Sequence, residues 1–291
     1  MDLDGFRRYL LELAGEKNGE AGFFDPRGVM WRVSREPVLL VAGMRALLMQ
    51  VAHPKVAQGV ADHSAYRTDP LGRGVRTFTA VYAIVFGTRE EAVAAAMRVR
   101  GIHARVRGRV RAAALPDGVD SHYTAEDPQL LFWVAATLLD SAVIAYERFV
   151  ARLSPDDKER LYSESKRFGQ MFGVPLAMYP PTWPDFREWM NETLTGSALT
   201  VTPAARDICR SLLNGTWLTR LAAPVNYVTA AMLLPPSLAS DYGLRRGAAV
   251  RVAYGLLAMI VTALVHAVPR RWRGVPAARR AERRVESTRR P

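Results

Sequence analysis

The side chain best placed for chemistry is that of His103, one of five histidines. Imidazole can hold a transition metal or carry a proton near neutral pH. A helix through residues 98–111 would place His103 in an apolar stripe at helical spacing, formed by Val99, Ile102, Val106 and Val110. The opposite face would carry Arg98, Arg105 and Arg109. We therefore predict that the imidazole points into the protein.

Two further arginines lie beside this histidine. Arg100 and Arg107 are three and four residues from His103, at the border of the same predicted face. A neutral imidazole on an apolar wall with cations at its edge suits haem b, because the porphyrin needs an apolar slot, the iron a nitrogen, and the propionates positive partners. The alternative is a core histidine with one hydrogen bond and solvated arginines, and the composition leaves both open.

A second group of polar residues begins the next helix upstream. Residues 67–74 contain a proline and two glycines, which indicate a turn leading into a helix. On that helix Arg73, Arg76 and Thr77 share one face, and the apolar wall beside them consists of Phe78, Tyr82, Val85 and Phe86. We predict that the two cations and the hydroxyl face a cavity. The alternative is a helix start with solvated arginines.

The remaining candidates have weaker settings. His53 and His63 lie near helix ends and are expected to cap or support rather than to bind a metal, and His122 and His266 receive no role. Trp133 is expected either to line the haem or substrate slot or to belong to the core.

The elements that must position these residues are helices. Apolar residues recur at helical spacing almost throughout, so the fold class expected is all-α, as a single multi-helix domain. Asp127-Pro128 and Ser154-Pro155 have the pattern of an N-cap followed by proline at the first helical position. The helices are expected at about 4–16, 34–53, 74–86, 89–112, 128–152, 155–172, 182–195, 202–213, 216–233 and 246–267.

Composition narrows the class of protein. The chain has 291 residues, of which 49% are hydrophobic, enough for one large core. The single cysteine, Cys209, excludes an internal disulfide and a cysteine-ligated zinc or iron–sulfur site. From Arg270 onward nine arginines stand against two glutamates, so this tail carries +7 of the formal +12 and the body +5. We therefore expect no nucleic-acid partner.

The same features bear on location and organisation. The acidic, amphipathic start lacks a secretory pattern, so a cytoplasmic protein is expected. Residues 248–268 are nearly apolar and are expected to form a buried helix; the alternative is a weak peripheral membrane contact, in which the basic tail favours anionic lipid. The expected parts are an N-terminal helical extension (1–29), a main domain (30–268) and a basic tail (269–291), which is either a solvated helix or disordered.

Residues 53–108 resemble the domain shared by the bacterial latex-clearing (rubber) oxygenases and the fungal MpaB oxygenases. Further similarity lies in Tyr123 to Pro128 followed by Trp133, in the "GVP…YPPTWPDF" segment and in "LLPPSL". The resemblance runs from about Met30 to about Gly243. It implies a globin-like haem-binding core, with the histidine of "HARVRG", His103, as the ligand of the iron in haem b.

The resemblance also implies roles on the opposite side of the haem. An arginine and a threonine of the family fall on Arg73 and Thr77. Latex-clearing proteins have beside that threonine a lysine that can ligate the iron, and here the residue is Arg76. Arginine has no lone pair to donate, so a lysine-closed state is not expected. The family's glutamate base has no clear counterpart; Asp62 is a substitute of low standing and the base is left unassigned.

The function expected from the resemblance is a haem-dependent oxygenase that uses dioxygen on an apolar, isoprenoid-like substrate. One haem scaffold supports several reactions. A desaturase or hydroxylase that tailors a small natural product is therefore a second hypothesis, which Arg76 favours. A non-catalytic haem sensor or carrier is a third, and a membrane or nucleic-acid binder that uses its arginine tail is a fourth.

Overall fold

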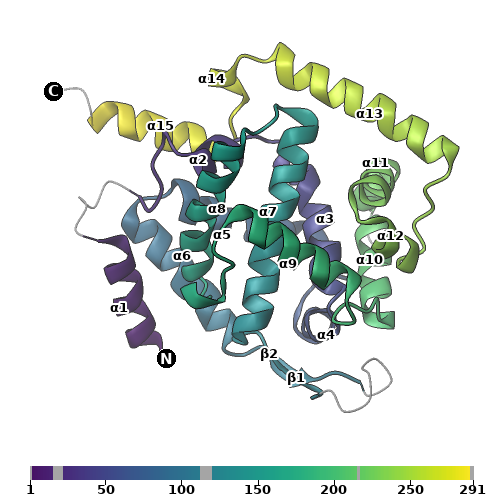
Figure 1. The fold of residues 1–291 in the computed structure, drawn as a ribbon, viewed down its shortest axis with the longest axis horizontal. Coiled ribbons are helices and arrows are strands. Elements are labelled where there is room, and N and C mark those ends of the chain that lie inside the picture. The colour runs from purple at the N-terminus through teal and green to yellow at the C-terminus, as the bar shows by residue number, and fades with distance from the viewer. Residues whose placement is uncertain (1, 16–21, 112–119, 215–216, 289–291) are drawn as a thin grey trace.

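Helix α7 (Pro128–Phe149) runs through the middle of the molecule, and the other helices pack around it (Figure 1). The computed structural model describes residues 2–15, 22–111, 120–214 and 217–288. Over these residues the chain is a single all-α domain of fifteen α-helices, 73% helical. The predicted fold class is confirmed to that extent.

The helices follow one another along the chain with short connections. Besides α7 they are α1 (Leu3–Ala14), α2 (Val29–Ser34), α3 (Leu39–Val51), α4 (Pro54–His63), α5 (Pro70–Phe86), α6 (Arg89–His103), α8 (Pro155–Gln170), α9 (Trp183–Thr195), α10 (Pro203–Asn214), α11 (Trp217–Leu233), α12 (Pro236–Asp241), α13 (Ala248–Ala267), α14 (Arg270–Arg273) and α15 (Pro276–Thr288). A 3-10 turn, η2 (Leu176–Met178), precedes α9.

The predicted helix starts are confirmed by their side-chain caps. The carboxylate of Asp127 accepts a hydrogen bond from the backbone N–H of Gln129 at 2.9 Å, and the hydroxyl of Ser154 accepts one from Asp157 at 3.0 Å. Each cap is followed by proline, whose missing N–H costs nothing in the first turn. These starts fix where α7 and α8 begin.

Helix α6 is shorter than the sequence pattern predicts. It ends at His103, whereas the expected helix ran to residue 112. Beyond it, β1 (Arg107–Arg109) pairs antiparallel with β2 (His122–Thr124). The ring of Tyr123 lies against Gly108, where a Cβ would come within 2.6 Å of its hydroxyl oxygen. Pairing with β2, which lies further along the chain, therefore places the residues of β1 in a strand instead of in a continuation of α6.

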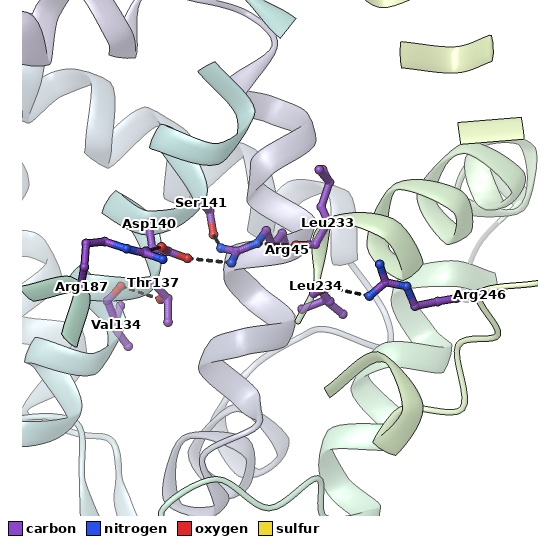
Figure 2. A network of polar contacts seen from close by, with 9 residues as sticks. All are labelled: Arg45, Val134, Thr137, Asp140, Ser141, Arg187, Leu233, Leu234 and Arg246. Atoms are coloured by element: carbon purple, nitrogen blue, oxygen red, sulfur yellow. Dashed lines mark hydrogen bonds and ion pairs between the residues drawn. The ribbon is translucent and has the colours of Figure 1, made fainter. Parts of the chain in front are cut away.

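A buried ion pair joins four helices near the centre (Figure 2). Nη2 of Arg45 on α3 lies 2.6 Å from Oδ2 of Asp140 on α7, and the two side chains are 4% and 2% exposed. Arg45 also donates to the hydroxyl of Ser141 and to the carbonyl of Leu233, each at 2.7 Å, and Arg187 of α9 donates to Asp140. The network ties α3, α7, α9 and the end of α11.

The C-terminal helices depart from expectation in opposite directions. Helix α13 was expected to be buried, but only 6% of its apolar window is buried in the protein, so that prediction was wrong. The tail forms helix α15, as one of its two alternatives had it, but it also docks on the core through Ala278 and Ala281 of α15 and through Val275 just before that helix. Its Arg284 donates to the backbone carbonyl of Phe86 at 2.7 Å.

Candidate functional site

The helical hairpin of α5 and α6 brings the two groups of polar residues to one end. The turn lies between Phe86 and Arg89, and the helices pack against each other. The stretch of α5 from Arg73 to the turn is nearly as long as the stretch of α6 from the turn to His103. At a rise of 1.5 Å per residue, each residue therefore lies about 20 Å from the turn. Residues 30 positions apart in the sequence thus share the open end of one hairpin.

His103 is the last residue of α6 and is half-buried. Burial lowers the pKa of its imidazole, Arg100 lowers it further, and Glu126 opposes the shift. The ring is therefore neutral at pH 7 and keeps a lone pair for a ligand. Within the described ranges no residue forms a hydrogen bond with this ring.

The apolar stripe predicted around His103 is not formed. Ile102 is 53% exposed, and Val106 and Val110 lie beyond the helix end. Val110 is buried all the same, because it follows β1 and donates its backbone N–H to the carbonyl of Ser121 at 2.8 Å. The partial burial of His103 therefore does not come from a continuous stripe.

The two arginines predicted beside His103 occupy different surroundings. Arg100 is largely buried, its Nη2 lies 2.8 Å from Oε1 of Glu126, and its guanidinium covers the ring of Phe6 at 5.2 Å. Arg107 belongs to β1 opposite Thr124, and its side chain is exposed. Arg100 therefore acts on His103 through its charge, while Arg107 is free to approach an anionic group at the surface.

On α5, Arg73 is the half-buried cation. Burial lowers the pKa of its guanidinium, and the neighbouring charge of Arg76 adds to the effect. Arg76 is exposed, with its Nη1 2.8 Å from Oδ2 of Asp69, which also caps the helix. The hydroxyl of Thr77 donates to the carbonyl of Arg73 at 3.0 Å. Arg73 is thus the more buried of the two arginines on this helix.

An aromatic wall follows on the same helix. The rings of Phe78 and Tyr82 lie 5.8 Å apart, and those of Tyr82 and Phe86 5.7 Å apart. The buried hydroxyl of Tyr82 has no hydrogen-bond partner in the described part of the chain. Gly74, four residues before Phe78, is half-buried, yet no atom lies within 4 Å of where its Cβ would be. Space and an unpaired donor therefore lie along one face of α5.

Trp133 is not part of this wall. Its side chain is 3% exposed within the core around α3, and its indole N–H donates to the carbonyl of Gln50 at 3.3 Å. Its ring contacts Trp189 edge to face at 6.4 Å. Of the two roles expected for Trp133, these contacts fit a side chain of the core.

The other histidines hold structural positions. His53 caps α4, with its Nδ1 accepting from the N–H of Lys55 at 3.2 Å, as expected. His63 bonds the carbonyl of Arg107 at 3.2 Å and so ties α4 to β1. His122 and His266 are exposed.

Sequence reasoning named Asp62 only as a weak substitute for the base, without its partners, and it missed one charge near His103. Asp62 accepts from the hydroxyl of Tyr123 at 2.7 Å and from the amide of Gln58 at 2.8 Å, so its carboxylate is held in place. Glu126 was not singled out, although it stands inside the recognised stretch from Tyr123 to Pro128. From the sequence, an acidic residue just before a helix cap is expected to be solvated. The ion pair of Glu126 with Arg100 is seen only in the fold.

One surface hollow of about 600 Å³ lies between α1 and the first turns of α6. Its α6 residues include Val93 and Met97, which lie on another face than His103. This hollow is therefore separate from the open end of the hairpin.

The comparisons with known proteins agree with the resemblance. The chain belongs to the family described as "ER-bound oxygenase mpaB/B'/Rubber oxygenase, catalytic domain", whose model matches residues 31–287. Membership in this family implies oxygenase activity. Uncharacterised proteins of Mycobacterium bovis and Mycobacterium tuberculosis are each 28% identical over 198 residues, covering 65% of this chain and 74% of theirs. No solved structure matches the chain at a significant level.

Proposed function

We propose that this protein is a haem b-dependent oxygenase that uses dioxygen on an apolar, isoprenoid-like substrate, with His103 as the iron ligand. The observation that carries the proposal is that a half-buried imidazole, whose pKa is lowered by burial, and the half-buried guanidinium of Arg73 lie at the same end of one hairpin. Family membership supplies the class of reaction.

The residues present fit haem b in their chemistry. His103 offers one nitrogen, and within the described ranges no three His, Cys, Asp or Glu side chains gather around a bare ion. A single imidazole suits an iron whose other ligands come from a porphyrin. Arg107, and Arg100 in its ion pair with Glu126, are the cations beside His103 for the propionates, and Phe78 and Tyr82 are the aromatic side chains available to the ring.

When bound, haem b supplies the centre at which dioxygen is activated. The protein's own contribution is position and charge. Burial and, after it, the charge of Arg100 lower the pKa of His103 and so favour its neutral form. Arg73, Arg76 and Thr77 would orient the oxygen, for which the hydroxyl of Thr77 has to turn from the carbonyl of Arg73 and Arg76 has to leave Asp69. The aromatic wall keeps water from the apolar substrate.

The decisive experiment compares absorbance spectra of the parent protein and of His103→Ala, both expressed with haem. His122→Ala is the matched control, because that histidine is exposed. The proposal requires a Soret band in the parent and in the control and its loss in His103→Ala. A parent without haem contradicts the cofactor; a band that survives His103→Ala contradicts the ligand.

A second candidate reaction is desaturation or hydroxylation of a small natural product. The observation in its favour is Arg76, a guanidinium held by Asp69 where the rubber enzymes have a lysine. Product analysis with polyisoprene and with short terpenes separates the two reactions. A spectrum with both axial positions of the iron filled by protein, and no turnover, would indicate the sensor hypothesis instead.

A further inference from the structure

Helix α13 presents a continuous apolar stripe to the outside of the protein. Val252, Leu256, Met259, Ile260 and Leu264 are 62%, 53%, 61%, 54% and 61% exposed, and their spacing of three and four residues places them on one face. A surface helix of a globular domain normally carries polar residues there. Figure 1 shows α13 as an outlying helix at the edge of the molecule.

The other face of α13 is fixed to the protein. Ala258 is fully buried, and Tyr254, Val261 and Val265 pack on the cluster around α7. The guanidinium of Arg148 on α7 lies over the ring of Tyr254 at 5.4 Å. The helix has the length and hydropathy to cross a bilayer, but its packed inner face holds it along the surface. An apolar stripe held in this way can enter a membrane only with the helix axis parallel to the membrane plane.

The charges around the stripe select the partner. No acidic residue occurs between Asp241 and Glu282, whereas Arg245 and Arg251 stand at one end of α13 and Arg270 and Arg271 at the other. All four are exposed, and none forms an ion pair with the described residues. A self-associating surface of this kind would bring like charges together, whereas an anionic bilayer would neutralise them.

An exposed aromatic residue lies among the arginines that follow the apolar stripe. Trp272 on α14 is 63% exposed, and the guanidinium of Arg271 lies 4.9 Å from its ring. Tryptophan favours the interface between lipid headgroups and acyl chains. The apolar stripe, the tryptophan and the arginines are the side chains that suit the acyl chains, the interface and the anionic headgroups of one leaflet.

We propose that α13 and α14 form a monotopic attachment site for an anionic phospholipid bilayer, with the stripe immersed and the four arginines at the headgroups. This site does not depend on the cofactor or on the reaction proposed above. Its position on one side of the protein would hold the molecule at the membrane in a fixed orientation.

The test is co-flotation of the full chain with vesicles of phosphatidylglycerol and phosphatidylcholine, and with phosphatidylcholine alone. Leu256→Gln/Leu264→Gln should weaken binding to the anionic vesicles on the order of tenfold or more. Arg270→Gln/Arg271→Gln should weaken it about fivefold per arginine. The control Leu3→Gln/Leu176→Gln changes two other exposed leucines and should bind as the parent does.

Three results overturn the proposal. One is a folded parent that does not float with anionic vesicles, and another is equal loss of binding in the α13 variant and the control. The third is a parent that sediments as a dimer, dissociates on substitution in α13 and ignores vesicles, because the occupant is then a second copy. If the α13 variant does not fold, a dye on Met259→Cys in a Cys209→Ser background reports immersion by a blue shift with vesicles.

Discussion

The guanidinium of Arg100 lies 2.8 Å from the carboxylate of Glu126, and the two charges act in opposite directions on the pKa of His103. Because the pair is largely shielded from water, neither charge is fully screened. The protonation of the proposed ligand is therefore set by a neighbouring ion pair as well as by burial.

Replacing the carboxylate in Glu126→Gln removes the negative charge of this ion pair. The pKa of His103 should fall further, and the free energy of unfolding should drop by about 1–2 kcal/mol, between the values for exposed and buried pairs. An NMR titration of the imidazole and denaturant unfolding measure the two effects. Glu90→Gln on the exposed first turn of α6 is the control, and an unchanged pKa of His103 in Glu126→Gln would contradict the assignment.

The hydroxyl of Tyr82, which has no hydrogen-bond partner among the described residues, gives a second prediction. In the haem-free protein Tyr82→Phe should leave stability unchanged or raise it by up to about 1 kcal/mol, because a buried donor without a partner is removed. Tyr123→Phe, which loses a hydrogen bond to Asp62, should cost about 1–3 kcal/mol. Haem titration of both variants then tests whether the Tyr82 hydroxyl serves a ligand: weaker retention in Tyr82→Phe alone is expected.

His53 should make the protein sensitive to mild acid. Burial lowers its pKa to about 4, below the ordinary value of 6.5. Between these values the unfolded chain binds the proton and the folded chain does not, so stability is full above pH 6.5 and declines as the pH falls. From pH 7 to pH 5 the loss attributable to His53 should be about 2 kcal/mol.

The variant His53→Asn isolates this effect. Asparagine retains the cap on α4 but does not titrate. Unfolding free energies at pH 7 and pH 5 should therefore differ less in His53→Asn than in the parent. An equal loss in both proteins would assign the acid sensitivity to other groups.

Substituting either partner of the buried pair of Arg45 and Asp140 should destabilise the protein strongly. Among the described residues, Arg45→Met leaves Asp140 with only the partly exposed Arg187, and Asp140→Leu leaves Arg45 with no counter-ion, so each should cost about 3–5 kcal/mol. Ser141→Ala removes one hydrogen bond to Arg45 and should cost about 1 kcal/mol. In a double-mutant cycle, Arg45→Met/Asp140→Leu should cost less than the sum of the single changes. Additive costs would mean that the pair is not coupled.

The helix starts were predictable because their signals are local. A capping side chain and a following proline act within a few residues, as at Asp127 and Ser154. The end of α6 was not predictable in the same way, because it depends on a distant segment. The residues of β1 pair with β2, beyond residue 120, instead of continuing the helix. The stripe drawn through Val106 and Val110 failed for this reason.

The candidate site was predictable in its parts but not in its partners. His103, Arg73 and Thr77 stand out by residue type and by resemblance, and the hairpin then brings them to one end. The ion pairs of Arg76 with Asp69 and of Arg100 with Glu126 depend on side-chain geometry that spacing does not contain. Apolarity likewise does not distinguish a core helix from one that faces outward, which is why α13 was predicted to be buried.

The docking of α15 decides how the basic tail has to be studied. Truncation after Pro269 would remove the arginines, but it would also strip Val275, Ala278 and Ala281 from the core and take Glu282 from Arg35, 3.2 Å away. A shortened chain would then lose binding and folding together. Neutralising Arg280 and Arg283 on the outer face of α15 leaves the helix packed on the core. These changes therefore separate the electrostatic contribution of the tail from its contribution to folding.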